Sequence, residues 1–254
     1  MNIQFASDLH LEFIMNNAYM EKYPLIVEGD ILILAGDVVP FNMMDKAKYF
    51  FDYVSDNFEM TYWIPGNHEY YRSDINERSG SFEEKIRDNV VLLNNKSVKY
   101  GNHKIIFSTL WTSIGERYAN DIKHGMNDFR VIKDDGLSLR PKKYNRLHQE
   151  CLAFIEKELT DCEEDEKSII VTHHVPTKIN YPEEYNGSIL NEAFAVELED
   201  FIKQTKPDYW IYGHHHSNVK EFTIDKTQLV TNQLGYVHIG EGGGFDSKRV
   251  IRID

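Results

Sequence analysis

Five short motifs in this chain combine histidine with acidic or amide residues, and each follows a short apolar run. In chain order they are Asp8-Leu9-His10, Gly36-Asp37, Gly66-Asn67-His68-Glu69, His173-His174 and Gly213-His214-His215-His216. Imidazole nitrogens with carboxylate and amide oxygens, and no thiolate, suit divalent Mn, Fe, Zn, Ni or Co. The motifs therefore predict a metal-binding site, and the sequence does not choose among these metals.

Each motif also has an ordinary structural interpretation. Asp8, Asp37 and Asn67 are residue types typical of turns at strand ends. The histidines at 173–174 fit a buried pair with satisfied hydrogen bonds, and those at 214–216 fit a surface loop. The order of the five motifs and their shared position after apolar runs favour one metal site over five unrelated turns.

The apolar runs before the motifs predict buried strands, because they are short, rich in β-branched or aromatic residues and bounded by Gly, Pro or Asn. They span residues 3–6, 31–34, 62–64, 169–171 and 210–212. Side chains just past the carboxyl ends of several strands converge on one edge of a sheet, where open α/β sheets hold their sites. We therefore expect the five motifs to meet at such an edge.

The rest of the chain supplies further helices and strands. Helical spacing or a capping signal predicts helices at 46–58, from 81 onward, at 144–159 and at 193–204. Further strands are expected at 90–93, 97–100, 104–110, 219–224, 228–231, 235–239 and 249–253, and long loops at 112–143 and 176–192. Early strands alternate with helices and late strands cluster as antiparallel pairs. This pattern predicts an α/β fold, a four-layer αββα sandwich of two mixed β-sheets flanked by helices, in one domain spanning 1–254.

Charge and composition argue against several classes of protein. The chain carries 28 Lys and Arg against 41 Asp and Glu, a net charge of −13, and its longest basic run is Arg140-Pro141-Lys142-Lys143. Proteins that bind duplexes usually carry a basic footprint, so long nucleic acid is not expected as the substrate. A small anionic substrate stays compatible with this acidity, because bound dications invert the local field.

The sequence gives no sign of membrane insertion or export. No apolar stretch approaches the roughly 18–20 residues that span a bilayer, and residues 1–6 lack the basic start of a signal peptide. The two cysteines, Cys151 and Cys162, are too few for a disulfide framework and are expected to be reduced thiols. We therefore expect a cytoplasmic protein with no membrane partner.

Taken together, the motifs resemble those of the calcineurin-like metallophosphoesterase superfamily, and in particular its small bacterial-type phosphoesterases. The family pattern is D-x-H, G-D-x-x, G-N-H-[DE], a histidine at a strand end and G-H-x-H, and this chain matches it in order from Asp8 to His216. The segments at 111–112 and 172–176 are also similar to bacterial members. One position departs from the pattern: many members carry an acidic residue where this chain has Pro40.

The resemblance implies a dinuclear metal centre. It implies two ligand sets that share one residue: Asp8, His10, Asp37 and His216 for the first ion, and Asp37, Asn67, His173 and His214 for the second. The Asp37 carboxylate would bridge two ions roughly 3.5–4 Å apart, and a hydroxide held between them would attack phosphorus in line. His68 would protonate the leaving oxygen or stabilise charge on the phosphoryl group.

Several assignments around this centre stay open. Either His173 or His174 could be the ligand; the family position favours His173 and leaves His174 for the substrate side. Glu69 could orient His68 or a ligand, or be a turn carboxylate. His215 is expected to point away from the metals.

Contacts with the substrate are expected from Arg72 and Tyr181, with the tyrosines at 70, 71 and 185 and Asn186 nearby. The ordinary alternative is that the aromatic side chains cover the core and that Arg72 is solvated.

The predicted function is hydrolysis of a small phosphomonoester or phosphodiester, with nucleotides and cyclic nucleotides as candidates. A nuclease of the same superfamily would be expected to carry basic surface, and a protein phosphatase an open groove that the loops at 112–143 and 176–192 would partly cover. A non-catalytic scaffold of the same fold would be expected to lack a ligand or the His68 equivalent, and all are present here. The sequence predicts no oligomeric state.

Overall fold

The computed structural model describes residues 1–253 and contains two six-stranded β-sheets. The first has the strand order β14-β1-β2-β3-β5-β4. Its strands are β1 (Asn2–Ala6), β2 (Ile31–Ala35), β3 (Met60–Ile64), β4 (Phe82–Arg87), β5 (Val90–Asn94) and β14 (Val250–Arg252). The four inner strands run parallel, and β14 and β4 close the two edges in the antiparallel direction.

The second sheet has the order β12-β13-β11-β10-β7-β6. Its strands are β6 (Lys96–Tyr100), β7 (His103–Ser108), β10 (Lys167–Thr172), β11 (Tyr209–Tyr212), β12 (Phe222–Ile224) and β13 (Thr227–Thr231). Its four inner strands are again parallel, with antiparallel edge strands β6 and β12. A short separate hairpin pairs β8 (Lys133–Asp134) with β9 (Leu137–Ser138).

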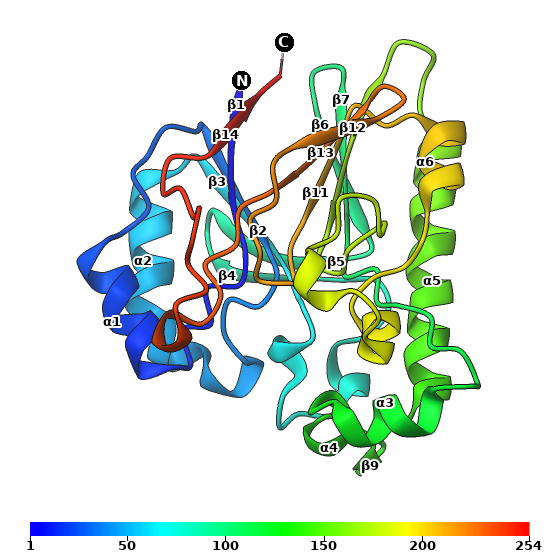
Figure 1. Cartoon of the computed structure of the whole chain (residues 1–254). Coiled ribbons are helices and arrows are strands. Elements are labelled where there is room, and N and C mark those ends of the chain that lie inside the picture. The colour runs from blue at the N-terminus through cyan, green and yellow to red at the C-terminus, as the bar shows by residue number, and fades with distance from the viewer. Residues whose placement is uncertain (254) are drawn as a thin grey trace.

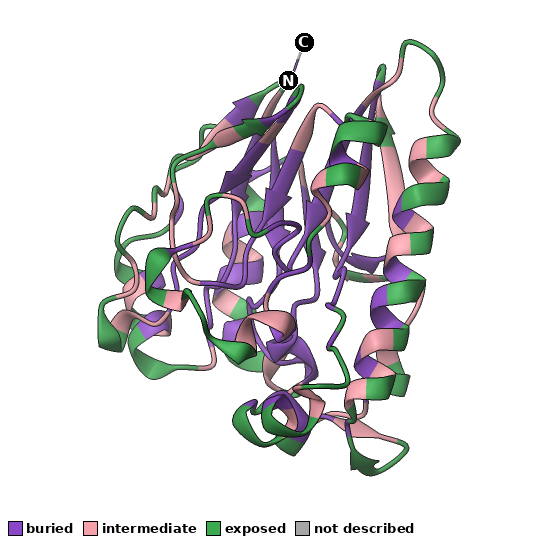
Figure 2. Ribbon diagram, turned by 45° about the vertical axis from the view of Figure 1, so that its right-hand side comes forward, coloured by how far each residue is buried: buried purple, intermediate pink, exposed green. Residues whose placement is uncertain are grey.

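The two sheets share one apolar layer. Side chains alternate between the two faces of a strand, so Ile3 and Ile33 of the first sheet meet Ile105 and Val171 of the second in a single buried cluster. Burial of these strands on both faces explains why they read as nearly continuous apolar runs. Figure 2 shows the inner strands as almost entirely buried.

Helices cover the outer face of each sheet. The helices are α1 (Ile14–Lys22), α2 (Lys48–Asn57), α3 (Ala119–Gly125), α4 (Asp128–Val131), α5 (Pro141–Thr160) and α6 (Glu199–Thr205). Phe51 of α2 packs on the first sheet beside Trp63, and Ile155 of α5 and Ile202 of α6 pack on the second beside Trp210. Figure 1 shows α1 and α2 beside one sheet, α5 and α6 beside the other, and α3 and α4 at the end away from the termini. The predicted four-layer αββα arrangement is confirmed.

Three predicted elements are wrong. The helix expected from residue 81 is strand β4, since Phe82 and Ile86 alternate with exposed neighbours and pack on the core at a period of two, which outweighs the capping signal. The helix expected at 193–204 begins only at Glu199, because the main chain of 194–198 hydrogen-bonds to that of 175–176 instead. The strand expected at 235–239 is a 3₁₀ turn over 237–239.

Two segments hold more structure than expected. The polar stretch after β1 forms α1, whose Asn16 and Met20 are buried. The excursion at 112–143 contains α3, α4 and the β8–β9 hairpin. Among the described residues, no helix has the length and apolar character needed to cross a bilayer.

Candidate metal centre and active site

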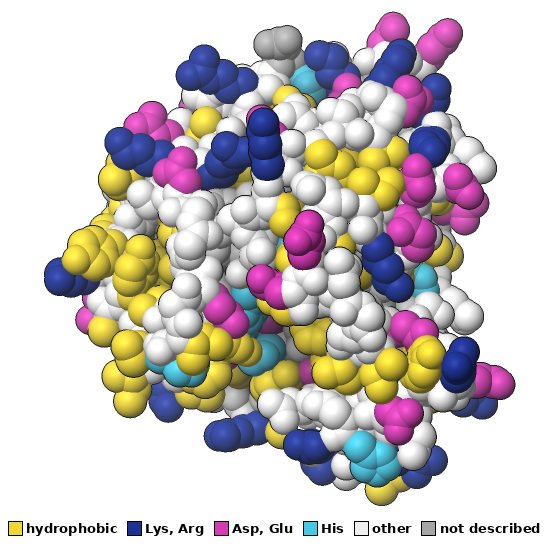
Figure 3. Space-filling view, in the orientation of Figure 1, with side chains coloured by type: hydrophobic (Ala, Val, Ile, Leu, Met, Phe, Trp, Pro, Cys, Tyr) yellow, Lys and Arg dark blue, Asp and Glu magenta, His cyan; other side chains and the backbone are white. Residues whose placement is uncertain are grey.

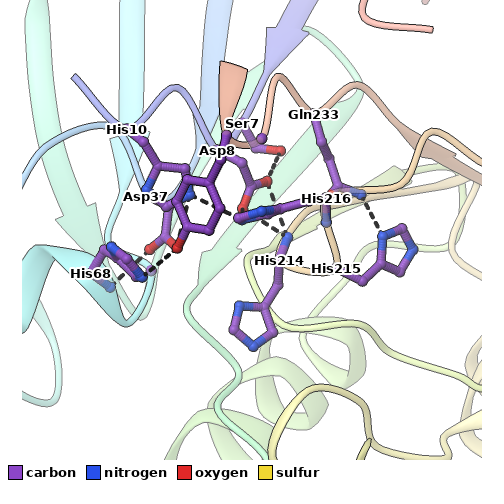
Figure 4. A network of polar contacts seen from close by, with 12 residues as sticks. Ser7, Asp8, His10, Asp37, His68, His214, His215, His216 and Gln233 are labelled. Carbon is purple, nitrogen blue, oxygen red and sulfur yellow. Dashed lines mark hydrogen bonds and ion pairs between the residues drawn. The ribbon is translucent and has the colours of Figure 1, made fainter. Parts of the chain in front are cut away.

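The five motifs lie on loops that leave five parallel strands at the same end of the molecule. The loops after β1, β2 and β3 bring the residues at 8–10, 37 and 67–68 from the first sheet. The loops after β10 and β11 bring those at 173 and 214–216 from the second sheet. The motifs therefore meet where the carboxyl ends of both sheets face each other, rather than at the edge of a single sheet (Figure 4).

The first predicted ligand set forms one tight group. Asp8, His10, Asp37 and His216 each offer a ligand atom, and these atoms all lie within 4.8 Å of one another. The Nε2 atoms of His10 and His216 are 2.9 Å apart. His216 Nε2 lies 3.4 Å from Asp8 Oδ1, and His10 Nε2 lies 3.8 Å from Asp37 Oδ2.

The second predicted set lies beside the first and shares Asp37. His173 Nε2 is 3.4 Å from Asp37 Oδ1, 3.0 Å from His214 Nδ1 and 3.3 Å from the amide oxygen of Asn67. Asp37 thus directs Oδ2 toward the first group and Oδ1 toward the second. This arrangement suits a carboxylate that bridges two cations.

His173 belongs to this group and its neighbour His174 does not. Both ring nitrogens of His174 have partners elsewhere, since Nδ1 lies 3.2 Å from the Thr109 carbonyl oxygen and Nε2 lies 3.0 Å from the Tyr144 hydroxyl. The geometry therefore favours His173 as the ligand and gives no support to a substrate contact by the fully buried His174.

In three of the candidate ligand histidines, Nδ1 lies beside a hydrogen-bond acceptor. This contact directs Nε2 of the same ring toward the other candidate ligands. His10 Nδ1 lies 3.2 Å from Glu12, His216 Nδ1 lies 2.6 Å from Glu241, and His173 Nδ1 lies 2.9 Å from a main-chain carbonyl. Histidines that bind metals almost always donate their second ring N–H in this way.

The electrostatics favour positive charge at two of the four candidate ligand histidines, His173 and His216, whereas burial lowers the pKa of His10 and His214. Burial alone lowers the pKa of His173, but Asp37 and its neighbours raise this pKa to about 9. Burial likewise opposes protonation of His216, yet Asp8 and Glu241 raise its pKa to about 10. Buried carboxylates and closely spaced imidazoles that attract protons in this way fit divalent cations.

The backbone at the candidate ligands is strained. The φ angles of Asp8, His10, Asp37, His214 and His216 are all positive, between 48° and 82°. Non-glycine residues in this region are uncommon and cluster at functional sites, because the surrounding structure must hold them there. The positive φ angles in these loops therefore cost stability, and they direct the candidate ligand side chains toward one point.

Two motif glycines are needed because a ligand occupies the space beside them. A Cβ atom at Gly66 would overlap the Asp37 carboxylate and His173, and one at Gly213 would lie 2.6 Å from Asp8 Oδ2. Any side chain at either position would displace a candidate ligand.

Glu69 is a turn carboxylate. Its two oxygens accept the backbone N–H groups of Asp37, Val38 and Gly66 at 2.7–2.9 Å and the indole N–H of Trp63 at 3.1 Å. These bonds support the turn role, and the bond from the Asp37 N–H also supports the alternative in which Glu69 orients a candidate ligand; among the described residues, no hydrogen bond joins Glu69 to the His68 ring. Glu69 thereby ties the loop after β2 to the loop after β3.

The acidic partner of His68 is Glu12, which the sequence analysis did not single out. Glu12 Oε1 lies 3.0 Å from His68 Nδ1 and 3.2 Å from His10 Nδ1. Burial alone raises the Glu12 pKa, but the bonds from His10 and His68 lower it to about 2. The only sequence signal for this residue is its position two residues after His10.

Replacement of Glu12 by Gln is expected to lower kcat about 10- to 100-fold at saturating Mn²⁺, with little change in KM. Both rings contact the same oxygen, Oε1, which a glutamine can keep, but the substitution removes the negative charge beside the rings and places an N–H₂ group at the buried Oε2 position, which has no hydrogen-bond partner. Steady-state kinetics on a phosphodiester measures the effect, and Glu28→Gln on an exposed side chain is the matched control. An unchanged kcat would show that Glu12 does not orient His68.

Asp128 of α4 fixes the orientation of the Asn67 amide. Its Oδ1 accepts from Asn67 Nδ2 at 3.0 Å and from the Tyr71 hydroxyl at 2.9 Å. Because the N–H₂ end of Asn67 is bound on this side, its oxygen faces His173 and the second group. No sequence pattern marked Asp128, which lies 61 residues from Asn67.

Replacement of Asp128 by Ala is expected to weaken Mn²⁺ binding at the second group by about 10- to 100-fold, since the Asn67 amide loses the partner that fixes its rotation. Asp128→Asn keeps an acceptor oxygen and should retain most of the affinity. Calorimetric titration distinguishes the two variants, with exposed Asp121→Ala as control. Equal affinity in Asp128→Ala and the parent chain would remove Asp128 from the site.

A cavity of about 390 Å³ opens beside the two groups. Asp37, Asn67, His68 and His214 form part of its wall, and Tyr181 also lines it; its contact with a substrate stays a prediction. Figure 3 shows histidine and acidic side chains within a hollow near the centre of this face, with hydrophobic side chains around it.

The predicted contact by Arg72 is not supported. Arg72 is exposed, has a φ of 62° and is absent from the cavity wall, because its loop turns toward Val131. His215 lies on the wall, but its Nδ1 contacts Gln233 at 3.0 Å, away from the candidate ligands as expected (Figure 4).

The chain belongs to the calcineurin-like phosphoesterase family, whose model matches residues 1–218. The superfamily resemblance predicted from the motifs is thereby confirmed. The uncharacterized protein L509 of Acanthamoeba polyphaga mimivirus is 32% identical to this chain, in an alignment that covers 99% of this chain and 96% of that protein.

One solved structure is similar along the whole chain. Phosphopantetheinyl hydrolase from Mycobacterium tuberculosis superposes with a TM-score of 0.73 over 100% of this chain and 96% of its own, at 16% sequence identity. At this identity the likeness supports the fold.

Proposed function

We propose that this chain is a metal-dependent phosphohydrolase that cleaves a small phosphomonoester or phosphodiester at a centre of two divalent ions. The observation that carries the proposal is the position of Asp37, whose two oxygens face two separate groups of ligand atoms. Asp8, His10, Asp37 and His216 would hold one ion, and Asp37, Asn67, His173 and His214 the other. Divalent ions at such a site supply charge neutralisation and an activated water nucleophile.

We expect His68 to act on the leaving group. It lines the cavity and belongs to neither predicted ligand set, although its ring forms a third group of possible ligand atoms with His10 and Glu12. Glu12 holds its Nδ1, and its Nε2 lies 3.3 Å from the Tyr236 hydroxyl, its hydrogen-bond partner. Proximity to Asp37 and Glu12 outweighs the effect of burial and raises the His68 pKa. A protonated Nε2 would donate to the oxygen that leaves phosphorus.

The backbone N–H of His68 has a second role. It donates to Asp37 Oδ1 at 2.9 Å. This bond fixes the rotation of the bridging carboxylate and links the proton donor to the metal site through one residue.

The experiment that tests the proposal compares bis-p-nitrophenyl phosphate with p-nitrophenyl phosphate, using metal-stripped protein resupplied with Mn²⁺. Preference for the diester would support a phosphodiesterase and a screen of cyclic and linear nucleotides. That screen should include phosphopantetheinyl compounds, since the M. tuberculosis structure of the same fold is a phosphopantetheinyl hydrolase. Preference for the monoester would support a phosphatase, and no turnover with any metal would contradict the proposal.

A further inference from the structure

The cavity beside the candidate metal centre has an aromatic wall. Tyr71, Tyr181, Tyr185, Phe194 and Tyr236 all line it. Tyr71 stacks on the His68 ring at 4.0 Å, and Phe194 stacks on the His214 ring at 4.6 Å. The aromatic surface therefore begins at the candidate catalytic and metal-binding rings and continues outward.

Parts of this wall are fixed in place. The Tyr71 hydroxyl donates to Asp128, and the Tyr185 hydroxyl donates to the His215 carbonyl oxygen at 3.1 Å. Tyr181 lies against Tyr185 with ring centroids 5.8 Å apart. Rings that are already held lose little conformational freedom when a ligand packs against them.

The other cavity side chains lack positive charge apart from the histidines. Among the described residues, no Lys or Arg lines the cavity, whose polar members outside the metal centre include Asn127, Ser188 and Asn191. The carboxylate of Glu241 also lies on the wall, with His216 as its partner. A ligand group in this region therefore meets aromatic surface, neutral amides and one negative charge.

Positive charge would be confined to the metal centre. Two dications at this centre would bind one phosphate group. Among the described residues that line the cavity there is no Lys or Arg, and Glu241 on the same wall would repel a second phosphate.

We infer that the outer part of this cavity is a subsite for an uncharged organic group, aromatic or amide-bearing, attached to a substrate with one phosphate, and that it discriminates against a second phosphate. The inference rests on the proposed function, because the metal centre must hold the scissile phosphate. The substrates would be esters of a single phosphate with a neutral, planar organic substituent.

The test compares two substrates that share one scissile bond. Thymidine 5′-(p-nitrophenyl phosphate) carries a neutral nucleoside, and its 3′-phosphorylated form carries a second phosphate. With Mn²⁺, kcat/KM is expected to be at least about tenfold higher for the first. Equal values, or preference for the 3′-phosphorylated form, would overturn the inference while leaving the proposed hydrolysis intact.

A charge variant sharpens the comparison. Asn127 lies at the cavity, is exposed and does not cap α4 with its side chain, so Asn127→Lys adds a cation there at little structural cost. This variant should reduce the ratio of kcat/KM between the ester with one phosphate and its 3′-phosphorylated form. Asn120 is an exposed residue of α3 that does not line the cavity. Asn120→Lys is therefore the matched control and should leave this ratio of kcat/KM unchanged. An unchanged ratio in Asn127→Lys would contradict the claim that missing positive charge in the cavity disfavours a second phosphate.

A second pair of substrates tests whether an aromatic substituent packs on the aromatic wall. Benzyl p-nitrophenyl phosphate and methyl p-nitrophenyl phosphate each carry one p-nitrophenyl leaving group and differ in the second substituent, an aromatic ring or a methyl group. A ring that packs on the aromatic wall should raise kcat/KM about threefold to tenfold over methyl, and Tyr181→Ala should reduce this ratio. Equal reactivity of both esters in the unmodified chain would remove the aromatic substituent from the proposal.

A binding measurement decides the inference even if turnover is absent. Calorimetry on the Mn²⁺-loaded protein compares thymidine 5′-monophosphate with thymidine 3′,5′-bisphosphate. Tighter binding of the monophosphate would support the subsite, and equal or tighter binding of the bisphosphate would overturn it. Absence of hydrolysis for all substrates would instead count against the proposed function.

Discussion

Asp37→Asn is expected to bind fewer than two Mn²⁺ ions per chain with high affinity and to lose more than about 100-fold in turnover, beyond the range found for residues behind the ligands. The reason is geometric: the two oxygens of Asp37 face His10 and His173 separately. An asparagine keeps one oxygen and replaces the other by an N–H₂ group, which does not bind a cation. One ion loses a ligand directly, and the loss of negative charge weakens the binding of both ions.

The variant should fold normally, which makes the result interpretable. The amide oxygen of an asparagine can still accept the N–H of His68, the bond that Asp37 Oδ1 makes at 2.9 Å. Calorimetric titration of metal-stripped protein with Mn²⁺ gives the stoichiometry, and Asp45→Asn on an exposed side chain is the control. Two ions bound by Asp37→Asn with unchanged affinity would contradict the bridging role.

His68→Ala is expected to retain two Mn²⁺ ions and to lower kcat about 100- to 10,000-fold, the range for removal of a general acid. Metal binding should persist because His68 belongs to neither predicted ligand set, and the third group of possible ligand atoms, formed by His68 with His10 and Glu12, lies outside both sets. The surface variant His124→Ala serves as control. Full turnover in His68→Ala would remove this residue from the mechanism, and loss of the metals would make it a ligand.

The leaving group distinguishes the two roles that His68 could have. If its Nε2 protonates the leaving oxygen, the defect in His68→Ala should be large for an alkyl ester and small for p-nitrophenyl, a good leaving group that needs little help. If His68 only stabilises charge on the phosphoryl group, both esters should lose turnover equally. Measuring kcat for the pair therefore tests the position of the proton directly.

The sequence predicted the centre of the site better than its surroundings. The residues at 8–10, 37, 67, 173 and 214–216 follow strands whose apolar pattern is unmistakable, and parallel strands deliver their carboxyl ends to one place. These residues do lie together. The positions that support them come from distant segments without a local pattern: Asp128 acts on Asn67 from 61 residues away, and Glu241 acts on His216 from 25.

Residues 69 and 81–87 show why local patterns fail. Glu69 stands beside His68 in sequence, yet the turn directs its carboxylate to the main chain of the β2 loop, and Glu12 from another loop takes the place beside His68. At 81–87, a capping signal predicted a helix, but the alternate burial of Phe82 and Ile86 on the first sheet produces a strand. Tertiary packing decides both outcomes, because local preferences are worth less than burial.

The measurement that tests the central claim most directly is hydrolysis of bis-p-nitrophenyl phosphate by metal-stripped protein as Mn²⁺ is added. The account predicts no turnover without metal and a rise that saturates when two ions are bound per chain. Turnover in the absence of metal, or saturation with a single ion, would contradict a dinuclear centre built on Asp37.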